Sequence, residues 1–141
     1  MPVLEGRIGP DGATAEVVVR PSSFARESRP ELEDRSVRAR ALFDTGSDIT
    51  HIQSGLAEKL GIFPHEAATV SGIHDTSQDC VVFDVDLELP QGGILLPNLW
   101  VVESTFETIG REPIEVLLGR SVLVRGRLVY DGWNGRFTFE V

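Results

Sequence analysis

The chain has 141 residues, of which 41% are hydrophobic and 25% are charged, and its formal net charge is −9. This length suits one small domain with its own core, so we expect a single domain over residues 1–141. The 22 acidic residues outnumber the 13 basic ones. This balance argues against nucleic acid as a partner, because phosphate binding requires clustered lysine and arginine.

Cysteine content and hydropathy argue against disulfides, membrane helices and a signal peptide. The single cysteine, Cys80, excludes a disulfide framework within the chain. No stretch approaches the ~20 apolar residues that a membrane helix needs, and residues 1–10 lack the apolar run of a signal peptide. We therefore expect a cytoplasmic protein that does not bind membranes.

The first part of the chain predicts strands separated by polar connections. Valine-rich residues 15–20 predict a strand, and charged residues 21–35, with two prolines, predict an exposed loop. Residues 36–43 predict a second strand, which delivers Asp44 at its end, and residues 48–52 predict a third.

A short helix is predicted next, between Ser54 as N-cap and Gly61 as the C′ glycine. Pro64 prevents its continuation. Residues 68–73 and 80–89 then predict a hairpin. In its second arm, alternate residues form an apolar face of Val81, Phe83, Val85, Leu87 and Leu89.

The remaining elements are also mostly strands. The predicted ones are a turn at 91–93, strands at 94–102 and 116–118, a helical turn at 121–125, and a final hairpin of 128–130 with 136–141. The hairpin is joined by Asp131-Gly132 and Asn134-Gly135, which favour tight turns. The sequence therefore predicts an all-β domain with one or two short helices.

Two motifs carry the chemistry. A hydrophobic strand runs into Asp44-Thr45-Gly46, and a second one runs through Leu117 and Leu118 into Gly119-Arg120. In this order, the two motifs resemble those of the retropepsin-like aspartic proteases, and the resemblance spans roughly Ala15 to the C-terminus. It implies a closed β-barrel of the acid protease type, with a flap hairpin and a cleft formed between two copies of the chain.

The resemblance implies that Asp44 is the catalytic residue. Peptide hydrolysis by this route needs two carboxylates around one water: the ionised one takes a proton from the water, and the protonated one polarises the scissile carbonyl. The chain has a single Asp-Thr-Gly, which implies a symmetric homodimer with the twofold axis between the two copies of Asp44.

Other residues of the active-site loop have expected tasks. Gly46 permits a tight turn and close approach of the substrate backbone, and the Thr45 hydroxyl is expected to bond across the axis to the partner's loop. Ser47 is expected to hydrogen-bond the outer oxygen of Asp44. In the family, the residues that match Asp48 and Arg120 form an ion pair, so we expect a partly buried contact between them.

Supporting residues follow from the same resemblance. Gly72, Ile73 and His74 occupy the place of the flap, which covers bound peptide. An ordinary surface hairpin is the alternative at this position. Gly119, with Arg120, is expected to support the active-site loop from below.

Other groups carry less information. His51, His65 and His74 lack the spacing of metal ligands, so we expect no metal and no organic cofactor. Leu117, Leu118 and Trp100 are expected in the core, and Trp133 in the packing of a turn.

These patterns predict an aspartic endopeptidase that acts on polypeptides as a homodimer. One alternative is a dimeric module that binds extended peptides in the same cleft without cutting them. Another is a structural barrel in which Asp44 only caps a turn.

Overall fold

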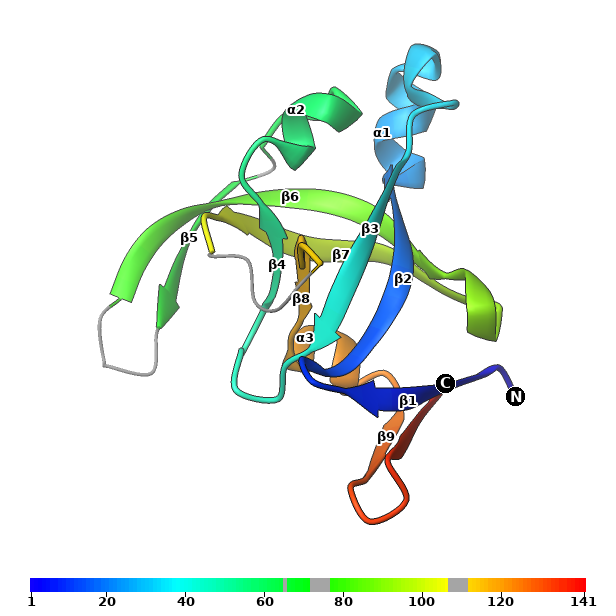
Figure 1. Ribbon diagram of the computed structural model, residues 1–141. Coiled ribbons are helices and arrows are strands. Elements are labelled where there is room, and N and C mark those ends of the chain that lie inside the picture. Colours follow the sequence, from blue (N-terminus) through cyan, green and yellow to red (C-terminus); the bar gives the residue numbers. More distant parts are fainter. Residues whose placement is uncertain (65, 72–76, 107–111) are drawn as a thin grey trace.

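A computed structural model of the chain describes residues 1–64, 66–71, 77–106 and 112–141. Six of its strands form a closed barrel, in the order β6-β7-β4-β8-β3-β2, because β6 also pairs with β2. Figure 1 shows these strands wrapping around one interior. Their bounds are Gly12–Pro21 for β2, Val37–Phe43 for β3, Thr50–Gln53 for β4, Ser77–Leu89 for β6, Ile94–Ser104 for β7 and Val116–Leu118 for β8. The prediction of an all-β closed barrel is confirmed.

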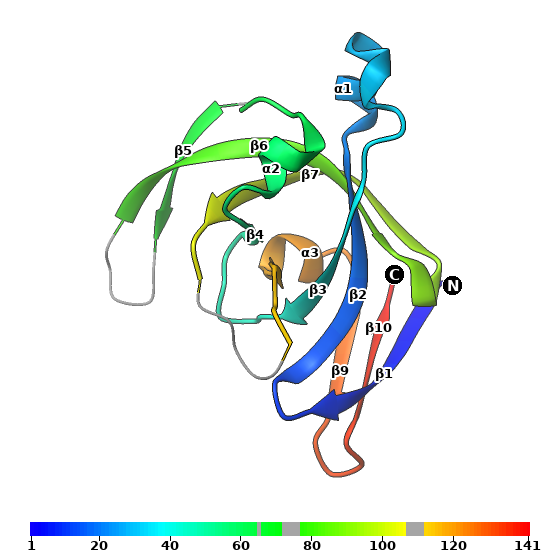
Figure 2. The same ribbon diagram turned by 45° about the horizontal axis from the view of Figure 1, so that its top comes forward.

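Two extensions leave the barrel. On one side, β5 (Glu66–Ser71) pairs with the start of β6 as a hairpin. On the other, β1 (Val3–Gly9), β10 (Arg136–Glu140) and β9 (Arg127–Asp131) form a three-stranded antiparallel ribbon. Figure 2 shows this ribbon beside the barrel, with the β9–β10 turn pointing away from it.

The sequence did not predict β1. Within this strand only Leu4 is buried, and the other residues are exposed or partly exposed. A strand with one buried residue has no apolar alternation to reveal it. The strand forms because it pairs with β10, at the other end of the chain, and such a distant pairing cannot be predicted from the local sequence.

Residues 21–35 were predicted as a loop, and this prediction is wrong. They contain α1 (Ser23–Ser28) and the 3-10 helix η1 (Pro30–Leu32). The Ser22 hydroxyl caps α1 by accepting the Ala25 N–H at 3.2 Å. No residue of α1 is buried, so the helix has no apolar stripe from which it could be predicted.

The other helical segments fall where turns or helices were expected. They are α2 (Leu56–Leu60), the 3-10 helix η2 (Pro90–Gly92) and α3 (Arg120–Leu123). Gly61 ends α2 with φ of 71°, as a C-terminal glycine should. The N-cap of α2 is Gly55 and makes no side-chain cap, so the predicted Ser54 cap is wrong.

The core lies inside the barrel and reaches to the strand end that carries Asp44. The Phe43 ring packs against Phe137 and Phe139 of β10, with centroids 5.5 and 5.3 Å apart. Such aromatic pairs add about 0.5–1.5 kcal/mol each beyond the area that they bury. The C-terminal hairpin therefore anchors the strand that ends at Asp44.

One residue of β6 and one of β7 that were predicted to be buried are exposed. In β6 the buried face runs from Phe83 to Leu89, but Val81 is exposed, and the register shifts between Val85 and Leu87. The shift does not explain this exposure, because Phe83, Val85, Leu87 and Leu89 are buried on both sides of it. Trp100 is about half exposed, so its predicted place in the core is also wrong.

Candidate active site

Asp44 follows β3 directly, at the point where the barrel opens to solvent. In β3 the alternate residues Ala39, Ala41 and Phe43 are buried, whereas Asp44 is only partly buried. The Asp44 N–H donates to the Leu118 carbonyl at 2.9 Å, which continues the parallel pairing of β3 with β8. The backbone that carries the carboxylate is thus fixed while the carboxylate itself remains accessible.

The carboxylate is oriented by its own loop. Asp44 Oδ1 accepts the Gly46 N–H at 3.0 Å, and the Asp44 carbonyl accepts the Ser47 N–H at 3.3 Å. A Cβ on Gly46 would lie 3.3 Å from Oδ1, so glycine leaves room for this bond. Among the described residues, Oδ2 has no hydrogen-bond partner. Thr45 is exposed.

The Ser47 hydroxyl does not bond the Asp44 carboxylate as predicted. It donates to the Ile49 carbonyl at 2.6 Å, which is a hydrogen bond within the loop. The Ser47 carbonyl accepts the Arg120 N–H at 2.8 Å. The residue therefore braces the loop from within, because its side chain and its backbone both bond to the main chain.

Gly119 lies directly under this loop. A Cβ there would lie 2.3 Å from the Ile49 carbonyl oxygen and 2.9 Å from that of Ser47. The Gly119 N–H donates to Thr50 Oγ1 at 3.2 Å, and Thr50 Oγ1 lies 2.9 Å from Ser121 Oγ. The predicted support by Gly119 is thus a close backbone contact that only glycine permits.

The predicted ion pair between Asp48 and Arg120 is not formed. Both residues are exposed, and none of the ion pairs between described side chains joins them. The two segments are joined by the main-chain bond from Arg120 to Ser47 instead.

Sequence reasoning missed two supporting residues, Thr50 and Ser121. Thr50 is fully buried, and its N–H donates to Ser121 Oγ at 3.1 Å. Thr50 is the first residue of β4, and Ser121 directly follows Gly119-Arg120. Hydroxyl residues at such positions are weak local signals. Their pairing depends on bringing the two motifs together.

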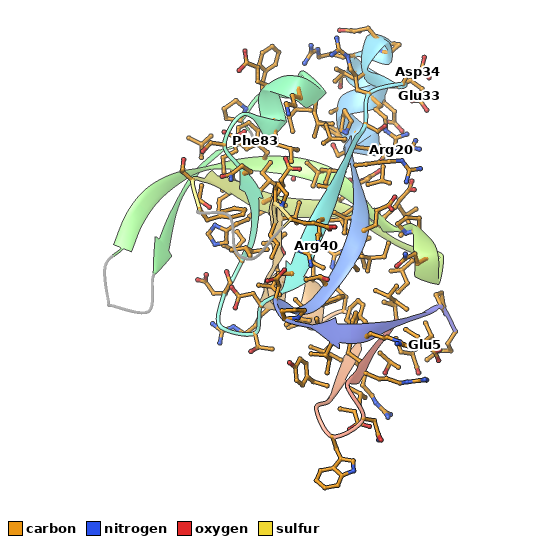
Figure 3. The ribbon with its side chains drawn as sticks, in the orientation of Figure 1. Glu5, Arg20, Glu33, Asp34, Arg40 and Phe83 are labelled. Carbon is orange, nitrogen blue, oxygen red and sulfur yellow. The ribbon has the colours of Figure 1, made fainter. Side chains whose placement is uncertain are left out.

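Arg40, labelled in Figure 3, connects β3 to two other segments of the chain. Its guanidinium forms an ion pair with Asp11 at 3.0 Å and donates to the Glu112 carbonyl at 3.3 Å. Asp11 lies in the turn between β1 and β2. The strand that ends at Asp44 is therefore tied to both neighbouring segments.

The sequence pattern of a family described as aspartyl protease matches residues 31–122. The match covers more than half of the chain and includes both Asp44 and Arg120. The chain belongs to the aspartyl protease family. Among curated proteins, no relative matches this sequence.

Solved structures place the fold within the same group. A retropepsin-like aspartic protease from Rickettsia conorii aligns with a TM-score of 0.59, over 97% of this chain and 89% of that chain, at 15% identity. The retroviral protease-like domain of Ddi1 from Leishmania major aligns with a TM-score of 0.47, over 90% of this chain and 88% of that chain, at 14% identity. The first of these likenesses confirms a retropepsin-like fold.

In this member of the aspartyl protease family, Asp44 shares one face of the sheet with residues of β3, β8 and β4. Side chains alternate along a strand, so Leu42 shares the face of Asp44. Leu42 lies opposite Leu117 of β8, which in turn lies opposite His51 of β4. All three are partly exposed. Leu117, predicted in the core, instead belongs to this outward face, whereas Leu118 is fully buried.

His51 is a titratable residue on this face, as is Asp44. Its Nδ1 lies 3.0 Å from Ser104 Oγ. Burial lowers the pKa of His51 below its ordinary value of 6.5, while the negative charges of Asp48 and Asp44 act in the opposite direction. The position of His51 near Asp44 cannot be inferred from local sequence, because it depends on the register of β4 against β8.

The flap prediction falls largely outside the described residues. The hairpin arms are present, with pairing from Glu66 opposite Val82 to Ser71 opposite Ser77. Gly72, Ile73 and His74 lie outside the residues that the structure describes.

The described residues do not gather into a metal site or form a membrane-spanning helix. Within them, no three His, Cys, Asp or Glu side chains gather closely enough to hold a metal ion. Their helices are all too short or too polar to cross a membrane.

Proposed function

We propose that the chain is an aspartic endopeptidase whose active site is completed by a second copy of itself. The family membership and the retropepsin-like fold support the reaction class. The observation that carries the proposal is the state of Asp44: its backbone is fixed by Leu118, its Oδ1 is oriented by Gly46, and the carboxylate remains accessible.

The second copy follows from chemistry. One carboxylate cannot both accept a proton from water and donate one to the scissile carbonyl, so two are needed. The chain has one Asp-Thr-Gly. Two Asp44 carboxylates across a twofold axis would share one proton, since like charges this close cannot both ionise freely.

The substrate is an extended polypeptide lying over the outward face beside Asp44. Leu42 and Leu117 offer apolar surface there, and His51 offers a polar ring. In the chemical step, one carboxylate takes a proton from water, the resulting hydroxyl attacks the carbonyl carbon, and the other carboxyl protonates the carbonyl oxygen. The tetrahedral intermediate then collapses: the carboxyl that took the proton from water gives it to the nitrogen, the C–N bond breaks, and the other carboxylate takes back the proton that it gave to the carbonyl oxygen.

The test is cleavage of a peptide library at several pH values, read by mass spectrometry. Asp44→Asn should abolish cleavage, because an amide cannot act as the base. Asp48→Asn is the matched control, since it makes the same change in the same loop at an exposed residue, and it should keep most activity. Equal cleavage by wild type and Asp44→Asn would refute the proposal.

The main alternative is a dimeric module that binds extended peptides without cutting them. Binding that survives in Asp44→Asn, together with no cleavage by wild type under any condition, would favour it. An accessible carboxylate on a braced loop favours the enzyme, because a pure binder has no chemical need for it.

A further inference from the structure

A pocket with charged walls lies beside β3, the strand that ends at Asp44. Its volume is about 610 Å³. Ligand pockets in proteins typically measure about 300–1,000 Å³, so this one is large enough to hold a ligand. Polar side chains from three segments line it: Thr14 and Glu16 of β2, Arg38 and Arg40 of β3, and Glu112 and Glu115 before β8.

The pocket lies on the same face of the sheet as Asp44. On β3, Arg40 comes two residues before Leu42 and four before Asp44, and side chains alternate along a strand. On the neighbouring strand, Glu115 comes two residues before Leu117 and shares its face in the same way. Both strands therefore lead from the pocket to the apolar surface that we assigned to the substrate.

The backbone of Glu115 is held on both sides. Its N–H donates to the Arg40 carbonyl at 3.0 Å, and its carbonyl accepts the Gln53 N–H at 2.8 Å. These bonds continue the sheet by one residue before β8 begins at Val116. The Glu115 side chain, which is partly exposed, therefore lines the pocket from a fixed position.

The positive charges in the pocket already have partners. Arg38 forms an ion pair with Glu16. Arg40 forms one ion pair with Asp11 at 3.0 Å and another with Glu112 at 3.6 Å. An anionic ligand would have to compete with these carboxylates for the two guanidinium groups, so the pocket is poorly suited to anions.

Glu115 is different, because its charge is not balanced in this way. Among the ion pairs between described side chains, none includes Glu115. Since it is partly buried, water and salt screen its charge less than that of a fully exposed carboxylate. The net charge of −9 also favours the approach of cations. The chemistry of the pocket therefore matches a cationic group.

The distance from Asp44 fits an extended polypeptide. The four residues from Arg40 to Asp44 span about 13 Å at the usual rise of a strand. An extended substrate has a similar rise, so a side chain within about four residues of the scissile bond can reach the pocket. The cationic groups that a polypeptide offers there are lysine and arginine side chains.

We propose that this pocket is a subsite of the substrate cleft and binds a lysine or arginine side chain of the polypeptide. Glu115 is the residue that sets this specificity, because it pairs with the cation. The proposal rests on the proposed function, since it places the scissile bond at Asp44. It adds the substrate class: polypeptides with a basic residue within about four positions of the cleavage site.

Peptide cleavage tests the charge preference. The probes are peptides that differ in one residue, lysine or glutamate, which is moved through the four positions on each side of a cleavage site found with the peptide library. For the best position, wild type should cleave the lysine peptide with a kcat/KM about tenfold above that of the glutamate peptide, because opposite charges attract and like charges repel. Glu115→Gln should remove most of this preference, and Glu115→Lys should invert it.

Glu58 supplies the matched control. It is an exposed glutamate on α2 and does not line the pocket. Glu58→Lys changes the net charge by the same amount as Glu115→Lys and should keep the wild-type preference for lysine. Circular dichroism on every variant checks the fold, and Glu115→Gln remains as the milder substitution if Glu115→Lys does not fold.

A binding measurement separates this proposal from the proposed function. Fluorescence anisotropy of the same peptides with Asp44→Asn reports on the pocket without cleavage. Tighter binding of lysine peptides, inverted when Glu115→Lys is added, supports the subsite even if wild type cleaves no peptide. Cleavage that depends on Asp44 but shows the same charge preference in wild type and Glu115→Lys would overturn the subsite and leave the proposed function standing. Equal binding of both peptide sets, or binding of neither, would overturn the subsite as well.

Discussion

The backbone N–H of Arg120 donates to the carbonyl of Ser47 at 2.8 Å. This bond joins the two sequence motifs, which are separated by most of the barrel strands. Because it involves only main-chain atoms, it requires no particular side chain at position 120. The close approach that it needs is provided by Gly119, over which the Ile49 and Ser47 carbonyls lie.

Gly119 should therefore matter far more for stability than Arg120. Gly119→Ala forces a Cβ to within 2.3 Å of the Ile49 oxygen, and we expect a loss of about 3 kcal/mol or more, because overpacked cores cannot relax freely. Arg120→Ala removes only an exposed side chain and should change the free energy of unfolding by less than about 0.5 kcal/mol. Urea denaturation of both variants measures the difference.

A large loss in Arg120→Ala would contradict this prediction. It would indicate that the Arg120 side chain has a partner that the isolated chain lacks, such as the second protomer. Repeating the measurement at protein concentrations above and below dimerisation distinguishes the two cases.

The sequence predicted the parts of the site that depend on local chemistry. Asp44 at a strand end, Gly46 after it and Gly119 after a second strand are each visible as short motifs. The six barrel strands were also predicted, because most of them carry an apolar run or alternation, whereas β1, which lies outside the barrel, was not. The joining of the two motifs came from a resemblance, and its predicted form, an Asp48–Arg120 ion pair, was wrong.

The missed features depend on contacts between distant segments. The Ser47 hydroxyl donates to the Ile49 carbonyl rather than to the Asp44 carboxylate. His51 comes near Asp44 only through the register of β4 on β8. The helix α1 has no buried residue and is held by a charged contact to β6. None of these can be inferred from periodicity.

That contact, between Arg26 and Asp86, should be important for stability. The two side chains are 2.8 Å apart and mostly buried, and Asp86 Oδ1 also accepts the Asn98 N–H at 2.9 Å. Asp86→Ala leaves the Arg26 charge without its buried partner and should cost about 3 kcal/mol. This is the lower end of the range for broken buried pairs, because Arg26 keeps a contact with Glu33.

The exposed ion pair between Glu16 and Arg38 is the control. Glu16→Ala should cost at most about 1 kcal/mol, as is usual for pairs in solvent. Thermal unfolding of both variants at one salt concentration tests the comparison. Equal losses would mean that burial does not distinguish the two pairs.

Thr50 should support the active-site loop through its hydroxyl. Thr50→Val keeps the shape of the side chain but removes the acceptor for the Gly119 N–H. A buried donor left unsatisfied costs about 1–3 kcal/mol, and we expect peptide cleavage to fall as well. Thr50→Ser keeps the hydroxyl and should lose only about 0.8 kcal/mol for the missing methyl group. Equal effects of the two substitutions would exclude the hydrogen bond as the cause.

His51 should make stability depend on pH. Its pKa in the folded protein lies below 6.5, mainly because burial disfavours the charged ring. Below pH 6.5 the unfolded chain therefore binds a proton at this residue more readily than the folded protein does. By linkage, the stability contributed by neutral His51 is fully present above about pH 6.5 and declines as the pH falls toward the folded pKa.

Replacing His51 by Gln should remove this component. We expect the free energy of unfolding of wild type to fall more between pH 7.5 and 5 than that of His51→Gln, as measured by urea denaturation at each pH. Asp44→Asn and Asp48→Asn each remove a negative charge that favours protonated His51. In each variant the free energy of unfolding should therefore fall more between pH 7.5 and 5 than it does in wild type. The same pH dependence in wild type and His51→Gln would show that the ring is free to protonate in the folded state.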